Sequence, residues 1–140
     1  MASPDPSSPP RSPCPIANAL DLLGDRWTLL VIRDLLFTGK RRFGELLASP
    51  EGIPTNILTD RLRRLEEGGL VEKTPYQLRP PRHEYQLTAK GKDLLPVLRV
   101  LADWSLRHLP ASEAPSAELL EEYKEKFRGL AARTSGPEEP

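Results

Sequence analysis

Residues 53–87 decide the fold, and they read IPTNILTDRLRRLEEGGLVEKTPYQLRPPRHEYQL. The first part, residues 54–67, has leucines at the i, i+4, i+7 spacing that places side chains on one face of a helix: Leu58, Leu62 and Leu65. Gly68-Gly69 predicts the end of this helix, because glycine tolerates a positive φ. Two β-like runs and their connection come next, at residues 70–78, 83–87 and 79–82. The stretch therefore predicts a helix followed by a hairpin whose tip, Arg79-Pro80-Pro81-Arg82, is basic.

Apolar residues at helical spacing predict four further helices, at residues 16–23, 27–37, 43–47 and 89–109. Gly24 predicts the end of the first helix, and Asp25 is the expected N-cap of the second. Thr88 is the expected N-cap of the last helix, which Pro96 should kink. The helix of residues 43–47 and the turn of residues 49–52 complete a helix-turn-helix. We predict an α+β fold, mainly α: a winged helix-turn-helix domain.

The composition is typical of one globular domain, with 140 residues, 38% hydrophobic and 29% charged. No apolar run reaches the length of a membrane span, and the N-terminus lacks the pattern of a secretory signal. A single cysteine excludes an intramolecular disulfide and a cysteine-based metal site. We expect a cytoplasmic protein without cofactor, metal or membrane partner.

The charges are unevenly distributed, although Lys+Arg and Asp+Glu are equal at 20 each. Residues 26–92 carry 13 basic against 8 acidic residues, whereas residues 110–140 carry 4 against 7. The basic excess coincides with the predicted helix and hairpin, and it is the electrostatic pattern that a DNA-binding surface requires. Double-stranded DNA is therefore the expected partner.

Five segments follow the order and spacing of a known family: Cys14–Leu36, Phe43–Leu47, Ile57–Val71, Pro80–Gly91 and Leu94–Trp104. On these segments, the chain resembles the HxlR-type winged helix-turn-helix regulators, relatives of the MarR group. The resemblance implies a transcriptional regulator, repressor or activator, that binds a pseudo-palindromic operator as a homodimer. It also implies N- and C-terminal dimerisation helices. Many family members have serine where this chain has Pro54, which leaves the helix cap expected at Ile53 or Thr55.

The candidate DNA-binding residues lie on the recognition helix, the wing and a basic loop: Thr55, Asn56, Thr59, Arg63, Arg64, Arg79, Arg82, Arg41 and Arg42. Asn can pair with adenine and Arg with guanine in the major groove, and an arginine of the wing suits a narrow minor groove or the backbone. The alternative is a solvated helix face with an Asp60–Arg64 ion pair. Arg61 lies nearer the buried side and is expected to serve the fold.

Cys14 coincides with a cysteine that many family members carry at the head of the first helix, where some relatives sense oxidants or quinone-like electrophiles. A redox-sensing Cys14, with an oxidant or small-molecule effector, is one hypothesis; a small buried hydrophobic residue is the alternative. His83 and His108 are too scattered for a catalytic or metal site, so no enzyme is expected. A protein-interaction adaptor that lost DNA binding is the rival function, and the presence of Asn56 and Arg63 argues against it.

The expected organisation has four parts: a disordered Pro/Ser-rich arm at 1–13, the winged helix-turn-helix domain at 14–110, a linker with an extra amphipathic helix at 111–132, and a flexible tail at 133–140. The extra helix, residues 117–130, has its apolar residues at helical spacing. It would either lengthen a dimer interface or dock on its own subunit.

Overall fold

The computed structural model describes residues 9–118 together with residues 121 and 125. Residues 1–8 of the expected arm, most of the expected helix at 117–130 and the expected tail at 133–140 lie outside the described residues. The chain forms two compact units, the first ending at Gly91 and the second beginning at Lys92. Within the described residues, helices dominate and one two-stranded sheet is present, so the predicted mainly α member of the α+β class is confirmed.

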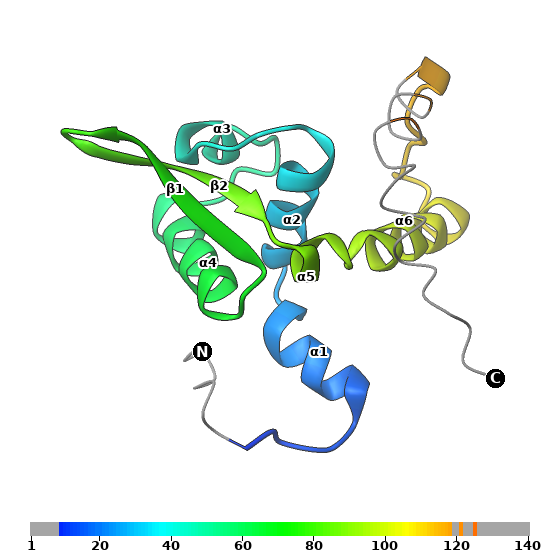
Figure 1. The fold of residues 1–140 in the computed structure, drawn as a ribbon. Helices are drawn as coiled ribbons and strands as arrows, with labels where there is room; N and C mark the ends of the chain where they lie inside the picture. The colour runs from blue at the N-terminus through cyan, green and yellow to red at the C-terminus, as the bar shows by residue number, and fades with distance from the viewer. Residues whose placement is uncertain (1–8, 119–120, 122–124, 126–140) are drawn as a thin grey trace. The chain divides into compact units, whose positions relative to one another are not determined.

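A short connection that begins at Gly24 joins the first two helices. Helix α1, Pro15–Leu23, ends at Gly24 (Figure 1), where an added Cβ would lie 2.4 Å from the carbonyl oxygen of Leu20. Helix α2, Thr28–Phe37, follows, and the carboxylate of Asp25 accepts hydrogen bonds from the backbone N–H groups of Trp27 and Thr28. The N-cap residue of α2 is Trp27, so the position predicted for the cap, Asp25, was wrong by two residues. The Asp25 side chain nevertheless supplies the acceptor for two amides at the start of α2.

The core of the first unit is built by three helices and the start of the hairpin. Helix α3, Phe43–Leu47, and helix α4, Thr55–Glu67, are joined by a turn and form the helix-turn-helix. The cap expected at Ile53 or Thr55 was wrong, because the N-cap of α4 is Pro54, which has an extended backbone with φ −66° and ψ 147°. The buried apolar side chains are Val31, Ile32, Leu36, Leu46, Ile53, Leu58, Leu62, Leu65, Leu70 and Val71. The leucine face predicted for α4 is thus confirmed.

The wing is an antiparallel hairpin of β1, Val71–Leu78, and β2, Pro81–Leu87. It extends away from α3 and α4 in Figure 1. The predicted connection of residues 79–82 was too long, because Pro81 and Arg82 pair with Leu78 and Gln77 as part of β2. Only Arg79-Pro80 forms the tip, so the wing is longer than predicted.

A third segment runs along the base of the wing. The backbone N–H of Tyr85 donates a 2.7 Å hydrogen bond to the carbonyl oxygen of Arg41, and Arg42 forms an isolated β-bridge with Glu84. The loop before α3 therefore joins the hairpin to the helix-turn-helix through backbone hydrogen bonds.

The predicted helix of residues 89–109 is wrong as one element. Two helices replace it, α5, Ala89–Lys92, and α6, Leu95–His108. Thr88 does cap the first, because its hydroxyl accepts a 3.2 Å hydrogen bond from the N–H of Gly91. Pro96 lies in the first turn of α6 instead of kinking a helix interior. Proline is tolerated in the first turn because the amide it lacks would have no helical partner there. None of the described helices is both long and apolar enough to cross a membrane.

Candidate nucleic-acid interface

Helix α4 presents a polar face opposite its buried leucines. Thr55, Asn56, Thr59 and Arg63 are all exposed, whereas Leu58, Leu62 and Leu65 are buried. The hydroxyl of Thr59 donates a 2.9 Å hydrogen bond to the carbonyl oxygen of Thr55, one turn earlier. The helix therefore offers hydroxyl, amide and guanidinium groups to a partner, the chemistry that base edges in a major groove accept.

Arg63 is held between two carboxylates on the same helix. Its guanidinium lies 2.7 Å from Asp60 Oδ1 and 2.9 Å from Glu67 Oε1. The hydrogen bond with Asp60 raises the pKa of Arg63, and the same bond lowers the pKa of Asp60. The Asp60–Arg64 ion pair of the alternative interpretation is not formed, since Asp60 instead contacts Arg63 and Arg61.

Arg61 and Arg64 connect α4 to the N-terminal part of the chain. Arg61 Nε lies 2.8 Å from Asp25 Oδ2, and its side chain is only 17% exposed. Arg64 donates a 3.3 Å hydrogen bond to the carbonyl oxygen of Asp21 in α1. The structural role expected for Arg61 is confirmed. Arg64 already has a protein partner, so its DNA contact stays a prediction.

We expect Asp25→Ala to lower the free energy of unfolding by about 1–3 kcal/mol, because it removes the acceptor of two amides at the start of α2 and a half-buried partner of Arg61. Partial burial acts to raise the pKa of Asp25, but hydrogen bonds from Thr28 and Arg61 outweigh it and lower the pKa to about 2, from an ordinary value of 3.8. The stability that Asp25 contributes is therefore present above the ordinary pKa and decreases as the pH falls toward about 2.

Urea unfolding of the wild type and Asp25→Ala, measured across that pH range, checks this prediction. The difference between the two proteins should narrow as the pH falls. Asp25→Asn, which retains an oxygen acceptor for the amides, should lose less stability. A difference that stays constant with pH would contradict the role assigned to the charge of Asp25.

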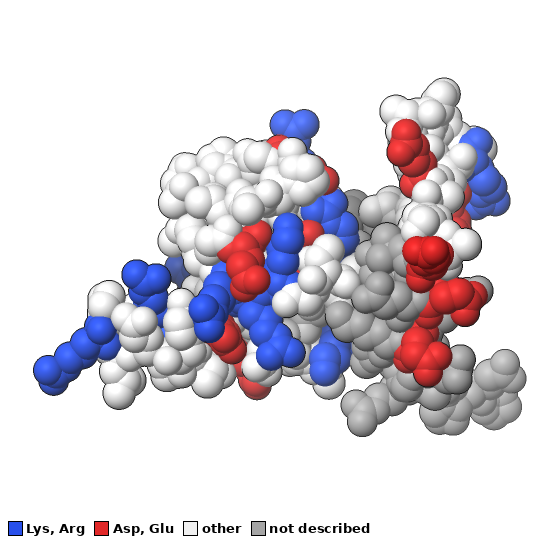
Figure 2. Space-filling model, turned by 90° about the horizontal axis from the view of Figure 1, so that it is seen from above, with Lys and Arg blue, Asp and Glu red and all other residues white. Residues whose placement is uncertain are grey.

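Two exposed arginines lie at the end of the wing, Arg79 in its tip and Arg82 near the start of β2. Figure 2 shows basic side chains at the left of the view, where the hairpin ends. The side-chain amide of Gln77 donates hydrogen bonds of 3.2 Å to the carbonyl oxygens of both Arg79 and Pro80. Neither arginine forms an ion pair within the part of the chain that the structure describes. Their guanidinium groups can therefore contact an external anion without breaking an internal pair.

Arg41 and Arg42 differ in their surroundings although both are exposed. The guanidinium of Arg42 lies 3.9 Å from the ring centroid of Tyr76 and 3.3 Å from Glu84, so it joins α3 to both strands of the wing. Tyr76 and Glu84 are not among the predicted site residues; the acidic Glu84 inside a basic hairpin was the signal that could have identified this contact. Arg41 contributes its carbonyl oxygen to the hairpin and leaves its guanidinium exposed.

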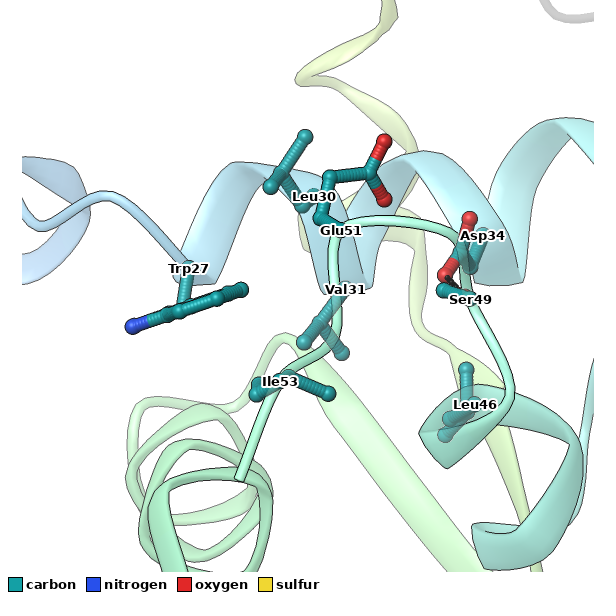
Figure 3. A pocket seen from close by; sticks show the side chains of 8 residues that line it. All are labelled: Trp27, Leu30, Val31, Asp34, Leu46, Ser49, Glu51 and Ile53. Carbon is teal, nitrogen blue, oxygen red and sulfur yellow. Dashed lines mark hydrogen bonds between the residues drawn. The ribbon is translucent and has the colours of Figure 1, made fainter. Parts of the chain in front are cut away.

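A shallow pocket lies between α2 and the turn of the helix-turn-helix (Figure 3). Its lining residues are Trp27, Leu30, Val31, Asp34, Leu46, Ser49, Glu51 and Ile53. The hydroxyl of Ser49 donates to the buried carboxylate of Asp34 and accepts a 2.8 Å hydrogen bond from Lys40.

Glu51 pairs with both terminal nitrogens of Arg33, at 2.7 and 2.9 Å, and that hydrogen bonding lowers the pKa of Glu51. The polar side chains in the pocket wall therefore already have hydrogen-bond partners within the protein. Its effect is to hold the turn against α2, which fixes where α4 begins.

Cys14 is exposed at the N-cap of α1, so the alternative of a buried hydrophobic residue is wrong. Its backbone N–H donates a 2.9 Å hydrogen bond to the hydroxyl of Ser12, and its carbonyl accepts from Asn18. Among the residues that the structure describes, no group of three His, Cys, Asp or Glu side chains is placed to hold a metal ion.

Comparisons with known proteins agree with this geometry. The family described as HxlR-like helix-turn-helix matches residues 22–113. An uncharacterized HTH-type transcriptional regulator of Mycobacterium tuberculosis is 47% identical over 104 residues, which cover 74% of this chain. This chain spans 65% of the length of that relative.

Two solved structures are also similar to this chain. The reduced form of the transcriptional regulator YodB from Bacillus subtilis has 32% identity and a TM-score of 0.58, covering 71% of this chain and 98% of its own. The reduced form of the redox regulator HypR has 32% identity and a TM-score of 0.60, covering 69% of this chain and 95% of its own.

Proposed function

This chain belongs to the HxlR-like helix-turn-helix family, and from that premise we propose that it reads an inverted-repeat operator as a homodimer and so regulates transcription. The observation that carries the proposal is the polar face of α4, with Asn56 and Arg63 exposed opposite the buried leucines. A helix of this kind can enter a major groove, where Asn pairs with adenine and Arg with guanine.

The wing and the basic loop supply the backbone contacts of this proposal. Arg79 and Arg82 at the end of the wing suit a minor groove or its phosphates, and Arg41 suits a flanking phosphate. DNA contacts by Arg42 and Arg64 stay predictions, because both side chains already have protein partners.

Two exposed apolar helix faces support the homodimer. In α1, Ile16 is 71% and Leu20 56% exposed; in α6, Val100 is 65% and Trp104 50% exposed. A monomer would present each of these faces to water, whereas a second copy would bury apolar area. Two recognition helices related by a two-fold axis then read half-sites about one DNA turn apart.

Selection of bound sequences from a random duplex pool tests the proposal, with the affinity for the selected sequence followed against salt concentration. An enriched inverted repeat and a steep salt slope are expected. Absence of enrichment would refute operator reading, and absence of binding at low salt would favour the adaptor.

A redox effector is the second candidate, favoured by the exposure of Cys14 and by the similarity to a redox regulator.

Diamide takes two hydrogens from two thiols, so a pair of Cys14 residues, one from each copy, would form a disulfide. We expect diamide to change operator affinity roughly five- to hundredfold in the wild type and to leave Cys14→Ser unaffected. Anisotropy titrations with and without oxidant measure this, and non-reducing gels show the linked dimer. An equal response of the two proteins would remove Cys14 as the sensor.

A further inference from the structure

The two carboxylates around Arg63 lie on the face proposed to meet DNA. Asp60 and Glu67 stand one turn before and one turn after Arg63, and each contacts a different terminal nitrogen of its guanidinium, at 2.7 and 2.9 Å. The three side chains are 36%, 46% and 51% exposed, in the order Asp60, Glu67 and Arg63. A groove-reading helix therefore has acidic groups beside its central basic one.

Asp60 is fixed in this position by a second arginine. Arg61 contacts the other carboxylate oxygen of Asp60 and also Asp25, whose carboxylate accepts hydrogen bonds from amides at the start of α2. Because Arg61 is mostly buried and anchored at Asp25, Asp60 keeps a partner if Arg63 moves away. The negative charge of Asp60 thus stays at the surface of α4 and is not left unpaired when Arg63 contacts DNA.

The pairs around Arg63 add little to folding stability, because exposed ion pairs are screened by water. Their effect on DNA binding is different. DNA carries about one negative charge per 1.7 Å of helix axis, and non-specific binding grows with the number of phosphates that basic residues neutralise. An arginine that is already neutralised by two carboxylates contributes little to that number, and the carboxylates repel a nearby phosphate.

A guanine edge offers Arg63 two acceptors without the negative charge of a phosphate. Its O6 and N7 accept two hydrogen bonds in a fixed geometry, and this pairing discriminates against the wrong base. Among the base edges of the major groove, only guanine replaces both of the hydrogen bonds that Arg63 gives up. A phosphate can also accept two, but its negative charge is repelled by the carboxylates of Asp60 and Glu67.

We infer that Asp60 and Glu67 are specificity-determining residues, which withhold Arg63 from backbone phosphates so that it leaves them only for a guanine edge. The inference rests on the proposed function, because it requires α4 to read DNA. Its consequence is that removing these charges strengthens binding to the wrong sequences more than binding to the operator.

The test uses the full chain with the isosteric changes Asp60→Asn and Glu67→Gln, singly and together. Affinities for the selected operator and for a scrambled duplex of equal length and composition are measured by anisotropy over a range of salt. For the double variant, we expect about tenfold tighter binding to the scrambled duplex at low salt, with a salt slope steeper by about one. Operator affinity should change by less than about threefold, so the ratio of operator affinity to scrambled-duplex affinity falls.

Two controls separate this effect from a general change of charge. Glu113→Gln with Glu118→Gln removes the same number of charges outside α4 and should leave the ratio unchanged. In an Arg63→Ala background, the double change at Asp60 and Glu67 should no longer steepen the salt slope, because the arginine that it releases is absent.

The outcomes are distinguishable. A fall in the ratio that requires Arg63 supports the inference. An equal rise of both affinities, no change in either, or a steeper slope without Arg63 would overturn it while leaving the proposed function intact. A wild type that does not prefer the operator to the scrambled duplex would overturn the proposed function, and the inference with it.

Discussion

Leu58→Ala is expected to lower the free energy of unfolding by about 2–5 kcal/mol. Leu58 has no exposed surface, and it lies between Leu62 and the start of α4 on the face that packs into the core. Alanine would lose the transfer free energy of the removed carbons and leave a cavity that its rigid neighbours only partly close. Because total stabilities are commonly about 5–15 kcal/mol, this one change would remove a large share.

Urea unfolding followed by circular dichroism measures the effect. Thr59→Ala is the matched control, because Thr59 is the next residue on the same helix and is exposed, with one hydrogen bond to the backbone of Thr55. Its cost should stay below about 0.5 kcal/mol. Comparable losses in the two variants would contradict the assignment of buried and exposed faces.

That contrast also shows why α4 could be predicted from the sequence. The three leucines have the spacing of one helix face, and Gly68-Gly69 stands where the helix ends, with Gly69 at φ +78°. Periodicity and a permissive residue are local properties, so they do not depend on the rest of the fold. The first residue of α4 could not be predicted in the same way. Pro54 supplies no side-chain cap, so the sequence does not distinguish a start at Ile53, Pro54 or Thr55.

The C-terminal helices show where such reasoning stops. Residues 89–109 are nearly continuous in helical pattern, so they predict one helix with a kink at Pro96. Proline restricts the residue before it and lacks an amide, which is compatible with a kink or with a new helix start. The chain takes the second solution, with a break at Asp93 and Leu94. The position of the break is not encoded in the apolar spacing.

The candidate site also has features that could be predicted from the sequence and features that could not. Exposure of Thr55, Asn56, Thr59 and Arg63 follows from the helix wheel and was predictable. The partners of Arg42 and Arg61 were not, since Glu84 and Asp25 are 42 and 36 residues away and meet them only through the tertiary fold. An arginine in a basic stretch can contact DNA or hold the fold together, and its partner decides which.

Arg63→Ala is expected to weaken operator binding about ten- to hundredfold and to relax the preference at one base pair of each half-site. The variant loses two hydrogen bonds to a base edge, and no other exposed side chain of α4 has the same planar pair of donors. Arg63→Lys keeps the charge but not the fork, so it should recover little of the preference. Repeating the duplex selection with the variant identifies the position that Arg63 reads.

Arg41→Ala is the contrasting change, because Arg41 is exposed on the loop that anchors the wing and is proposed to contact a phosphate. It should weaken binding to all sequences about equally and flatten the salt slope by about one. Arg63→Ala should instead leave the scrambled duplex within about twofold of the wild type, since its guanidinium is already neutralised by Asp60 and Glu67. If both variants lowered operator and scrambled binding alike, the division between a base-reading helix and a phosphate-anchoring loop would be wrong. A loss confined to the operator in Arg63→Ala would assign sequence reading to α4, because a phosphate contact cannot distinguish the two duplexes.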